Sequence, residues 1–505
     1  MQRYYIARQR LVWTGENFIL REKDMRKRKQ YSFYCYNCPT SGTYTHNNYT
    51  YTFGEDMRNA KRYKEYIDCG FDIVQARGGD VDGSEFKGVW EGSNCKKVFD
   101  EFLKAGGKKV LVTDHRFDVW IRDERDLVGE GKRFATEREL DEELKKCIAP
   151  YCKRKGFYGI QLFDEPKYSQ FPAYGQIARS LKRILPDAEL QCNLLPLGSR
   201  VDLFLSDSEL QNKEDDPVLK FATDSVPTSK IPIYEKYVND FLDATQIDNV
   251  LFDEYPFRRE YIISGSALPN YQLVGRICKK RNLEFRVVLQ SFSHAYNGAI
   301  HNRRINESDM YWQTNLALGF GVREFSFYTY MAKSVFDYKA GFGEADGAAF
   351  INLDGSKTAL YFYTQRIIAE MKKFAKVGLK YSYDNSYVVT EKGKTNEDFD
   401  WTRYVYENKK CPFAVEVDKG VALITEQSAV NGSADKLYMF ENFGNVRDEL
   451  LDGVGPMQMR IELPKGKKNF YYRGKKMRVK ADKDGKYTFH LKVGEAVFVE
   501  VKNGK

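Results

Sequence analysis

Short apolar runs alternate with amphipathic runs of helical length from about residue 31 to about residue 378. The short runs are rich in β-branched and aromatic residues, which predicts strands, and the longer runs have the helical period. Strands are predicted at 31–38, 71–78, 109–116, 157–165, 188–195, 249–256, 284–292 and 324–330. Helices are predicted at 55–69, 94–105, 136–152, 171–185, 231–244, 270–280, 309–319 and 358–377. Eight successive βα units predict an α/β fold, a (β/α)8 TIM barrel, with an open doubly wound sheet as the weaker alternative.

The helical pattern ends near residue 379, and short strand-like runs separated by turns such as Asn431-Gly follow it. This pattern predicts an antiparallel β-sandwich domain at the C-terminus. A chain of 505 residues also exceeds the usual size of one hydrophobic core. We therefore predict three parts: a lead and connector at 1–30, a catalytic barrel at 31–378 and the β-sandwich at 379–505.

Composition narrows the class of protein. No run reaches the eighteen apolar residues of a membrane span, so no membrane association is expected. The net charge of +9 comes from 80 basic and 71 acidic residues that are interspersed, which does not favour nucleic-acid binding. Nine scattered cysteines and an N-terminus without an apolar signal core favour a cytoplasmic protein. Aromatic residues make up 15% of the chain, and aromatic faces suit contact with sugar rings.

Two predicted strands end on adjacent acidic residues and a proline. One reads Phe157-Tyr-Gly-Ile-Gln-Leu-Phe-Asp-Glu-Pro166, and the other reads Leu251-Phe-Asp-Glu-Tyr-Pro-Phe257. Proline cannot donate to a sheet ladder, so the acids should lie at the C-terminal strand ends, where barrels bind ligands. A cap on the following helix is the alternative role for the first pair. Two carboxyl groups facing one cleft are what glycosidic cleavage requires.

Other polar and aromatic residues fall near the ends of the predicted strands or in the loops that follow. Alternation along each strand places several of them on the face that carries the acids, unless a bulge shifts the register. We expect a sugar-binding set of Arg77, Asp114, His115, Asn193, Tyr255, Gln290, His294, Tyr328 and Tyr330.

These motifs resemble the glycoside hydrolase clan that includes the family-42 β-galactosidases, and related gut-bacterial barrel proteins with a strand-four Asp-Glu-Pro. The resemblance lies in Tyr158-Gly-Ile-Gln-Leu-Phe-Asp-Glu-Pro166, Asp253-Glu-Tyr-Pro-Phe257, Gln290-Ser-Phe292 and Gly321-Val-Arg-Glu-Phe-Ser-Phe-Tyr-Thr-Tyr330. It spans roughly residues 31–378 and implies glycoside hydrolysis, with Glu165 as the general acid/base.

The chain departs from this family at two positions. Asp164 replaces the asparagine of the clan's Asn-Glu-Pro signature, and Gln290 stands where a nucleophilic glutamate is expected on strand seven. Three explanations stay open: Asp253 or Glu254 supplies the second carboxylate, Asp164 is the nucleophile with a strand-six acid, or the barrel binds sugar without cleaving it. Face parity and the family pattern favour Asp253 over Glu254.

No cofactor and no metal are expected. Cys35 and Cys38 have the spacing of half a zinc site, but no second pair of ligands follows. Arg258, Arg259, Arg303 and Arg304 support a weaker hypothesis of an acidic or sulfated sugar. The expected partner is a carbohydrate substrate, and a homo-oligomer stays open.

Overall fold

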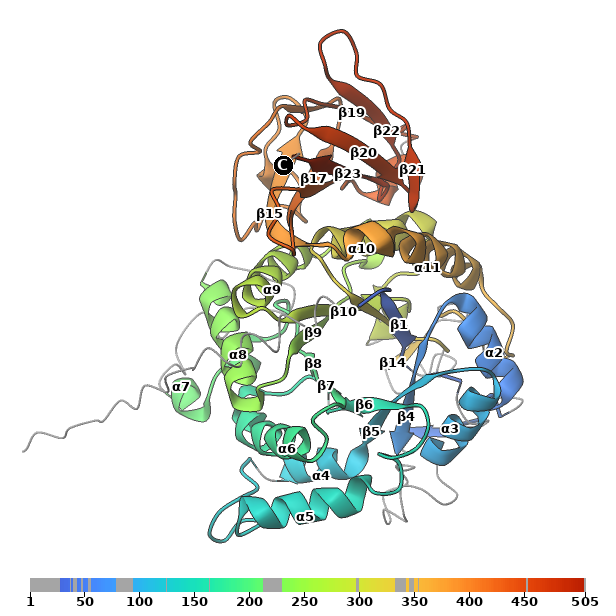
Figure 1. Cartoon of the computed structure of the whole chain (residues 1–505), viewed down its shortest axis with the longest axis vertical. Helices are drawn as coiled ribbons and strands as arrows, with labels where there is room; N and C mark the ends of the chain where they lie inside the picture. The colour runs from blue at the N-terminus through green and yellow to red at the C-terminus, as the bar shows by residue number, and fades with distance from the viewer. Residues whose placement is uncertain are drawn as a thin grey trace, which may run out of the picture.

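The computed structural model describes residues 28–503 apart from 37, 40–42, 47–48, 53–55, 79–93, 124, 163, 212–228, 297–298, 332–341, 345–348, 353 and 451–452. Parallel strands form a barrel at its centre (Figure 1). They are β1 (Ser32–Cys35), β4 (Ile73–Gly78), β5 (Lys109–Asp114), β6 (Phe157–Gln161), β7 (Glu189–Gln191) with β8 (Asn193–Leu194), β9 (Asn249–Glu254), β10 (Glu284–Gln290) and β13 (Glu324–Tyr328). The predicted barrel is confirmed.

Strand pairing runs in two arcs. One has the order β1-β13-β10-β9-β8 and the other β4-β5-β6-β7, and all of these pairs are parallel. Cys192 separates β7 from β8, so a single predicted strand joins the arcs on one side. On the other side the Asp72 N–H donates to the Phe33 carbonyl oxygen at 3.0 Å. The arcs therefore close on both sides.

Helices surround the strands (Figure 1), and all of them except the short α7, which has no buried residue, bury an apolar face in the barrel core. They are α2 (Ala60–Cys69), α3 (Asn94–Lys104), α4 (His115–Asp123), α5 (Glu137–Ile148), α6 (Phe171–Ile184), α7 (Asp207–Gln211), α8 (Lys230–Thr245), α9 (Ala267–Arg281), α10 (Glu307–Gly319) and α11 (Ala359–Gly378). Short elements in the connections are β2 (Thr43–His46), β3 (Tyr49–Thr52), β11 (His294–Tyr296), β12 (Ala299–Asn302), β14 (Phe342–Glu344), η1 (Tyr168–Gln170), η2 (Val201–Phe204) and η4 (Arg259–Tyr261).

Two predicted boundaries were wrong. Strand β6 ends at Gln161, before the acidic pair, and Glu165 itself has a left-handed backbone (φ 49°) that no strand accommodates. The chain after β5 begins α4 directly, so His115 is a helical residue and not a strand end. The sequence analysis did not predict α4.

Two antiparallel sheets follow the barrel. One has the order β15 (Tyr381–Thr390), β17 (Val421–Ala429), β18 (Lys436–Asn442), β23 (Ala496–Lys502), β20 (Lys467–Tyr472) and β21 (Lys475–Met477). The other has the order β16 (Val415–Val417), β19 (Met457–Ile461) and β22 (Tyr487–Leu491); η5 (Asn396–Asp398) and α12 (Val446–Leu450) lie in the connections. Their facing apolar residues form one core, as a sandwich requires.

The opposite face of the larger sheet packs on the barrel. Leu423 and Met439 belong to the same hydrophobic cluster as the barrel helices. The Trp312 ring of α10 stacks on Phe443 with centroids 4.4 Å apart. Figure 1 shows the sheets above α9, α10 and α11. The barrel and the sheets are thus joined by a continuous apolar core.

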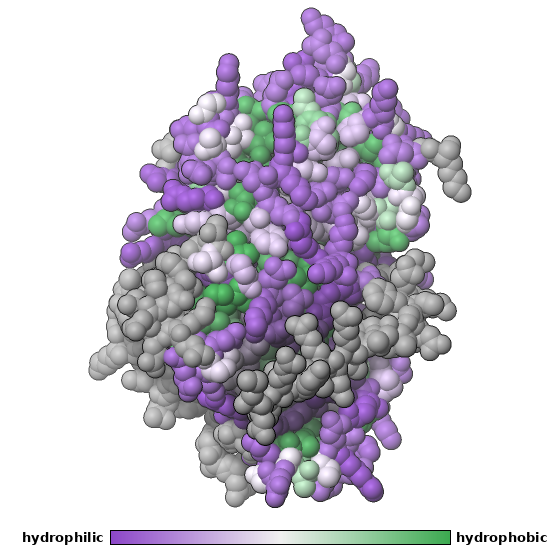
Figure 2. Space-filling view, turned by 90° about the vertical axis from the view of Figure 1, so that its left-hand side faces the viewer, coloured by the Kyte–Doolittle hydropathy of each residue, from purple (hydrophilic) through white to green (hydrophobic). Residues whose placement is uncertain are grey.

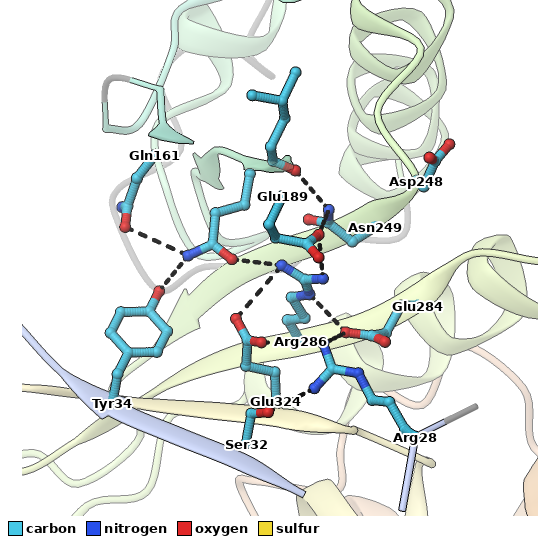
Figure 3. A network of polar contacts seen from close by, with 12 residues as sticks. Arg28, Ser32, Tyr34, Gln161, Glu189, Asp248, Asn249, Glu284, Arg286 and Glu324 are labelled. Carbon is cyan, nitrogen blue, oxygen red and sulfur yellow. Dashed lines mark hydrogen bonds and ion pairs between the residues drawn. The ribbon is translucent and has the colours of Figure 1, made fainter. Parts of the chain in front are cut away.

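Buried charged side chains lie at the N-terminal ends of the barrel strands (Figure 3). The Arg286 guanidinium donates to Glu189 at 2.6 Å and to Glu284 at 2.8 Å. Arg28, which precedes β1, donates hydrogen bonds to Glu284 and Glu324. A hollow of about 740 Å³ lies next to this network at the N-terminal ends of the strands. A layer with Tyr34, Ile73, Leu111, Leu251 and Val288 fills the barrel above it.

The surface seen in Figure 2 is mainly hydrophilic, with hydrophobic residues in small scattered patches. Within the described residues, no helix combines the length and apolar character needed to cross a bilayer. All nine cysteines are free thiols.

Candidate active site

Glu165 and Asp253 meet at the C-terminal end of the barrel. Glu165 lies in the loop after β6 and Asp253 on β9, with β7 and β8 between these strands. Their carboxyl groups are close enough for one to donate a hydrogen bond to the other. Much of the Glu165 residue is exposed, although protein surrounds its carboxyl group, whereas Asp253 is buried as a whole. The two motifs therefore supply one carboxyl pair in which one member can be reached from outside.

Asn193 of β8 fixes the acidic loop between the two strands. Its carbonyl oxygen accepts the Glu165 N–H at 2.8 Å, and its side-chain amide donates to Asp164 Oδ1 at 2.8 Å. The left-handed backbone at Glu165 is unfavourable for a residue with a side chain, and such strain concentrates at functional sites. Asn193 thus helps to hold a conformation that directs the Glu165 carboxyl toward Asp253.

The electrostatics of the pair favour protonation. Burial, followed by the nearby Asp164 charge, raises the pKa of Glu165 to about 7. Burial and the charges of Glu165 and Asp164 raise the pKa of Asp253 well above its ordinary value. Because two adjacent carboxylates cannot both ionise easily, the pair holds a shared proton near neutral pH. One protonated and one ionised carboxyl group are therefore present together.

Tyrosines form the wall beside these acids. Tyr255 follows Asp253 on the same face, and its ring lies 6.1 Å from that of Tyr328. The Tyr328 ring lies 6.3 Å from that of Tyr36 and contacts Phe292 edge-on at 5.1 Å. Tyr255 and Tyr328 are half-buried, so their rings are partly open to the site. Sugar rings commonly pack on such aromatic surfaces.

Glu254 lies on the other face of β9. Its two carboxylate oxygens accept hydrogen bonds from Ser266 at 3.3 Å and from Asn270 at 3.1 Å, both near the start of α9. The structure thus brings Asp253, and not Glu254, to Glu165, as the face parity predicted.

Gln290 is fully buried and bonded to backbone atoms. Its Nε2 donates to the carbonyl oxygens of Phe257, Phe292 and Arg303 at 3.2–3.3 Å, and its Oε1 accepts the Phe257 N–H at 3.0 Å. Gln290 therefore joins the loops after β9 and β10, and both amide donors are engaged within the protein.

Several other predicted site residues lie away from the pair. Asp114 is buried between Arg116 and Tyr151, which both bond its carboxylate. His115 Nδ1 lies 2.8 Å from Asp118 in α4. Tyr330 packs on Tyr66 with ring centroids 4.9 Å apart, outside the barrel. None of these contacts involves the acidic pair.

Two further predicted residues complete the set. Arg77 is half-buried at the C-terminal end of β4, on the same barrel face as Gln75. The backbone of His294 belongs to β11, but its side chain lies outside the described residues.

The sequence analysis did not include Tyr36 or Gln161 in the site. Gln161, the last residue of β6 before the acidic loop, donates a hydrogen bond to the Tyr36 hydroxyl. The Asp164 charge also contributes to the raised pKa of Tyr36, whose main cause is burial. The alternation Tyr34-Cys-Tyr36 in the first strand was the available signal, because it places both hydroxyls inside the barrel.

The described residues contain no group of three or more His, Cys, Asp or Glu side chains arranged to hold a metal ion. The arginines of the loops have partners within the protein: Arg303, for instance, binds both oxygens of Asp309 at 2.6 and 2.7 Å. That contact leaves the Arg303 guanidinium poorly placed for an acidic sugar.

No family model and no curated protein matches the chain. Several solved structures match the chain. The chain is similar in structure to glycoside hydrolase barrels. A protein described as a glycoside hydrolase has 12% identity and a TM-score of 0.48, with 94% of this chain and 98% of that chain covered. A family 5 glycoside hydrolase from Bacteroides vulgatus has 12% identity, a TM-score of 0.46 and 92% of each chain covered.

A family 30 subfamily 8 xylanase from Clostridium acetobutylicum has 11% identity and a TM-score of 0.36, with 87% of this chain and 92% of that chain covered. Likenesses of this degree do not identify an activity. The arrangement of residues in this chain must therefore support any functional conclusion.

Proposed function

We propose that this protein is a glycoside hydrolase that cleaves a glycosidic bond in an oligosaccharide or small glycoside with Glu165 and Asp253. The contact between these two carboxyl groups, at the barrel end where substrates bind, is the observation that supports the proposal. Glycosidic cleavage needs one protonated and one ionised carboxyl group, and the raised proton affinity of this pair provides both near neutral pH.

The roles follow from position. Glu165 is the more exposed of the two residues at the C-terminal end of the barrel and serves as the general acid/base that protonates the leaving oxygen. Asp253 lies deeper and, when the shared proton is on Glu165 and Asp253 is ionised, attacks the anomeric carbon. Inverting enzymes separate their carboxyl groups by about 6.5–9.5 Å to hold a water molecule, and a pair in contact leaves no such space. A retaining mechanism therefore suits this pair better, after a bound sugar moves the two groups slightly apart.

The alternative is a carbohydrate-binding barrel without catalysis. Gln290 suggests it, because it stands where the resembling family has a nucleophilic glutamate. The hydrogen bonds of Gln290 now explain that residue as a structural connection between two loops. Its identity therefore gives no reason to expect an inactive site, since Asp253 offers a carboxylate beside Glu165.

The test is release of sugar from a panel of natural oligosaccharides and α- and β-aryl glycosides. We expect at least one substrate to be cleaved, and Glu165→Gln to lower kcat by about 10²–10⁴-fold, the usual contribution of a general acid/base. Glycan binding without any release, in wild type and variants alike, would overturn hydrolysis and support the alternative. The product's anomeric configuration, measured by NMR, would separate retention from inversion.

A further inference from the structure

The loop that follows Asp253 on β9 has an unusual backbone. Glu260 and Tyr261 are consecutive non-glycine residues with left-handed φ angles of 55° and 59°. Left-handed residues with side chains are unfavourable, and two in succession need support from their surroundings. Within the loop, the Arg258 N–H donates to the Ile262 carbonyl oxygen at 2.8 Å, and the Ile262 N–H donates to Arg259 at 3.1 Å.

The C-terminal domain supplies part of this support. The side-chain Nδ2 of Asn445, in the connection after β18, donates to the Tyr261 carbonyl oxygen at 2.6 Å. Nearby, Gly265 at the end of the loop lies against Asp400 and Tyr404 of the same domain, with no room for a larger side chain without movement. The loop is thus held by residues far away in sequence.

The barrel holds the other side of the loop. The Arg303 N–H donates to the Phe257 carbonyl oxygen at 3.2 Å, and the Arg303 guanidinium lies 5.0 Å from the centre of the Tyr261 ring. The loop begins after Tyr255, whose ring lies beside the acidic pair. Its middle residues, Arg259, Glu260 and Ile262, are exposed at the catalytic end of the barrel.

We propose that Asn445 is a positioning residue for substrate binding, because its amide holds the left-handed Glu260–Tyr261 segment at the mouth of the site. The C-terminal domain then shapes the substrate-binding surface in addition to supporting the barrel. The segment contacts sugar units beyond the bond that is cleaved, so this inference rests on the proposed function for its consequence. Its physical basis, the hold on the loop, is independent of any activity.

The substitution Asn445→Asp removes the hydrogen bond to the Tyr261 carbonyl oxygen and little else. Asn445 Oδ1 also accepts the Arg447 N–H at 3.1 Å at the start of α12, and a carboxylate oxygen keeps that bond. The donor to Tyr261 is lost. Asn431→Asp is the matched control, because Asn431 Oδ1 accepts the Ser433 N–H at 3.0 Å in an exposed turn of the same domain.

The first readout is hydrogen–deuterium exchange in the full-length protein. We expect amides in a peptide covering residues 256–265 to exchange at least about tenfold faster in Asn445→Asp than in wild type and in Asn431→Asp, since the loop loses an anchor. Adding Glu260→Gly to Asn445→Asp should restore slower exchange, because glycine accepts the left-handed backbone without strain. Equal exchange in wild type and Asn445→Asp would overturn the positioning role.

The second readout is the split between KM and kcat on the cleaved oligosaccharide. Asn445→Asp should raise KM at least about fivefold and change kcat much less, since the residue acts on binding and not on the reacting atoms. An unchanged KM with faster loop exchange would show that the loop does not contact substrate and would overturn the inference. If wild type cleaves nothing, the proposed function fails, and calorimetric titration of oligosaccharides into both proteins decides this inference separately.

Discussion

At the scale of single residues, the site is defined by carboxyl groups placed where their charge is unfavourable. Glu165 has a strained backbone, and Asp253 is buried beside it. Burial and the Asp164 charge raise the pKa of Glu165, and burial with the charges of Glu165 and Asp164 raises the pKa of Asp253. Asp164 stands in the place where the resembling family has asparagine. Such arrangements reduce stability and are kept where a proton must be held near neutral pH.

The effect of Asp164 is testable through pH. Asp164→Asn removes one of the charges that raise the pKa of both Glu165 and Asp253. The pair should then release its proton at lower pH, and the alkaline limb of kcat/KM should move to lower pH. A pH–rate profile measures this shift. Asp187→Asn, an exposed acid at the opposite barrel end, is the control and should leave the limb in place.

A second unfavourable carboxyl group lies away from the site. Glu441 of β18 is fully buried, neither oxygen has a hydrogen-bond partner, and burial raises its pKa well above the ordinary value. The unfolded carboxyl ionises at its ordinary pKa, so Glu441 costs stability as pH rises above that value, and costs little at pH 4. Glu441→Leu should therefore raise the free energy of unfolding by about 1–3 kcal/mol at pH 8, and less at pH 4.

Glu500 of the same sheet provides the contrast. It is also buried, but Tyr381 and Asn469 donate to its oxygens at 3.0 and 2.8 Å. Glu500→Leu leaves both donors without an acceptor and should destabilise the protein. Thermal unfolding of both variants at the two pH values measures the difference; destabilisation by Glu441→Leu at pH 8 would contradict this account.

At the scale of elements, strand ends and the loops after them set the geometry of the mouth. Gln290, at the end of β10, accepts the Phe257 N–H and donates to the Phe257 carbonyl oxygen. One side chain thus joins the end of β10 to the loop after β9. A glutamate here would face three carbonyl oxygens without a proton to share. Gln290→Glu should therefore destabilise the protein by about 2–4 kcal/mol without increasing turnover.

Denaturant unfolding and kcat measurements on Gln290→Glu test this statement. Gln365→Glu is the comparison, because Gln365 donates to only one carbonyl oxygen at the surface, and its loss should cost well under 1 kcal/mol. A stable and more active Gln290→Glu would show that position 290 is a vacant nucleophile site.

The helices and strands also show which features of the fold the sequence pattern predicts. Apolar periodicity located the barrel strands and most helices, because burial on the sheet requires it. It failed near Glu165, where β6 ends at Gln161 and the loop that follows contains a left-handed residue, and at α4, where an amphipathic segment folds as a helix directly after β5. Face parity separated Asp253 from Glu254, but it did not show that Tyr330 would turn outward onto Tyr66. Side-chain direction beyond a strand end depends on contacts that alternation does not encode.

At the scale of the whole molecule, the barrel and the C-terminal sheets share one core. Trp312 is buried and stacks on Phe443 across the interface. Trp312→Ala removes this contact and should lower the free energy of unfolding by about 3–5 kcal/mol. Because the core is continuous, we expect calorimetry to show one unfolding transition for wild type and variant. Two separated transitions would contradict a shared core; the boundary at residues 378 and 379 stays a prediction.

The central claim is that Asp253, and not its neighbour Glu254, acts with Glu165 on a glycosidic bond. The most direct test is turnover of the best panel substrate by Asp253→Asn and Glu254→Gln, each with and without azide. We expect Asp253→Asn to lose at least about 10³-fold in kcat and to regain turnover with azide as a substitute nucleophile, while Glu254→Gln stays within a few-fold of wild type. Full activity of Asp253→Asn together with loss in Glu254→Gln would contradict the account.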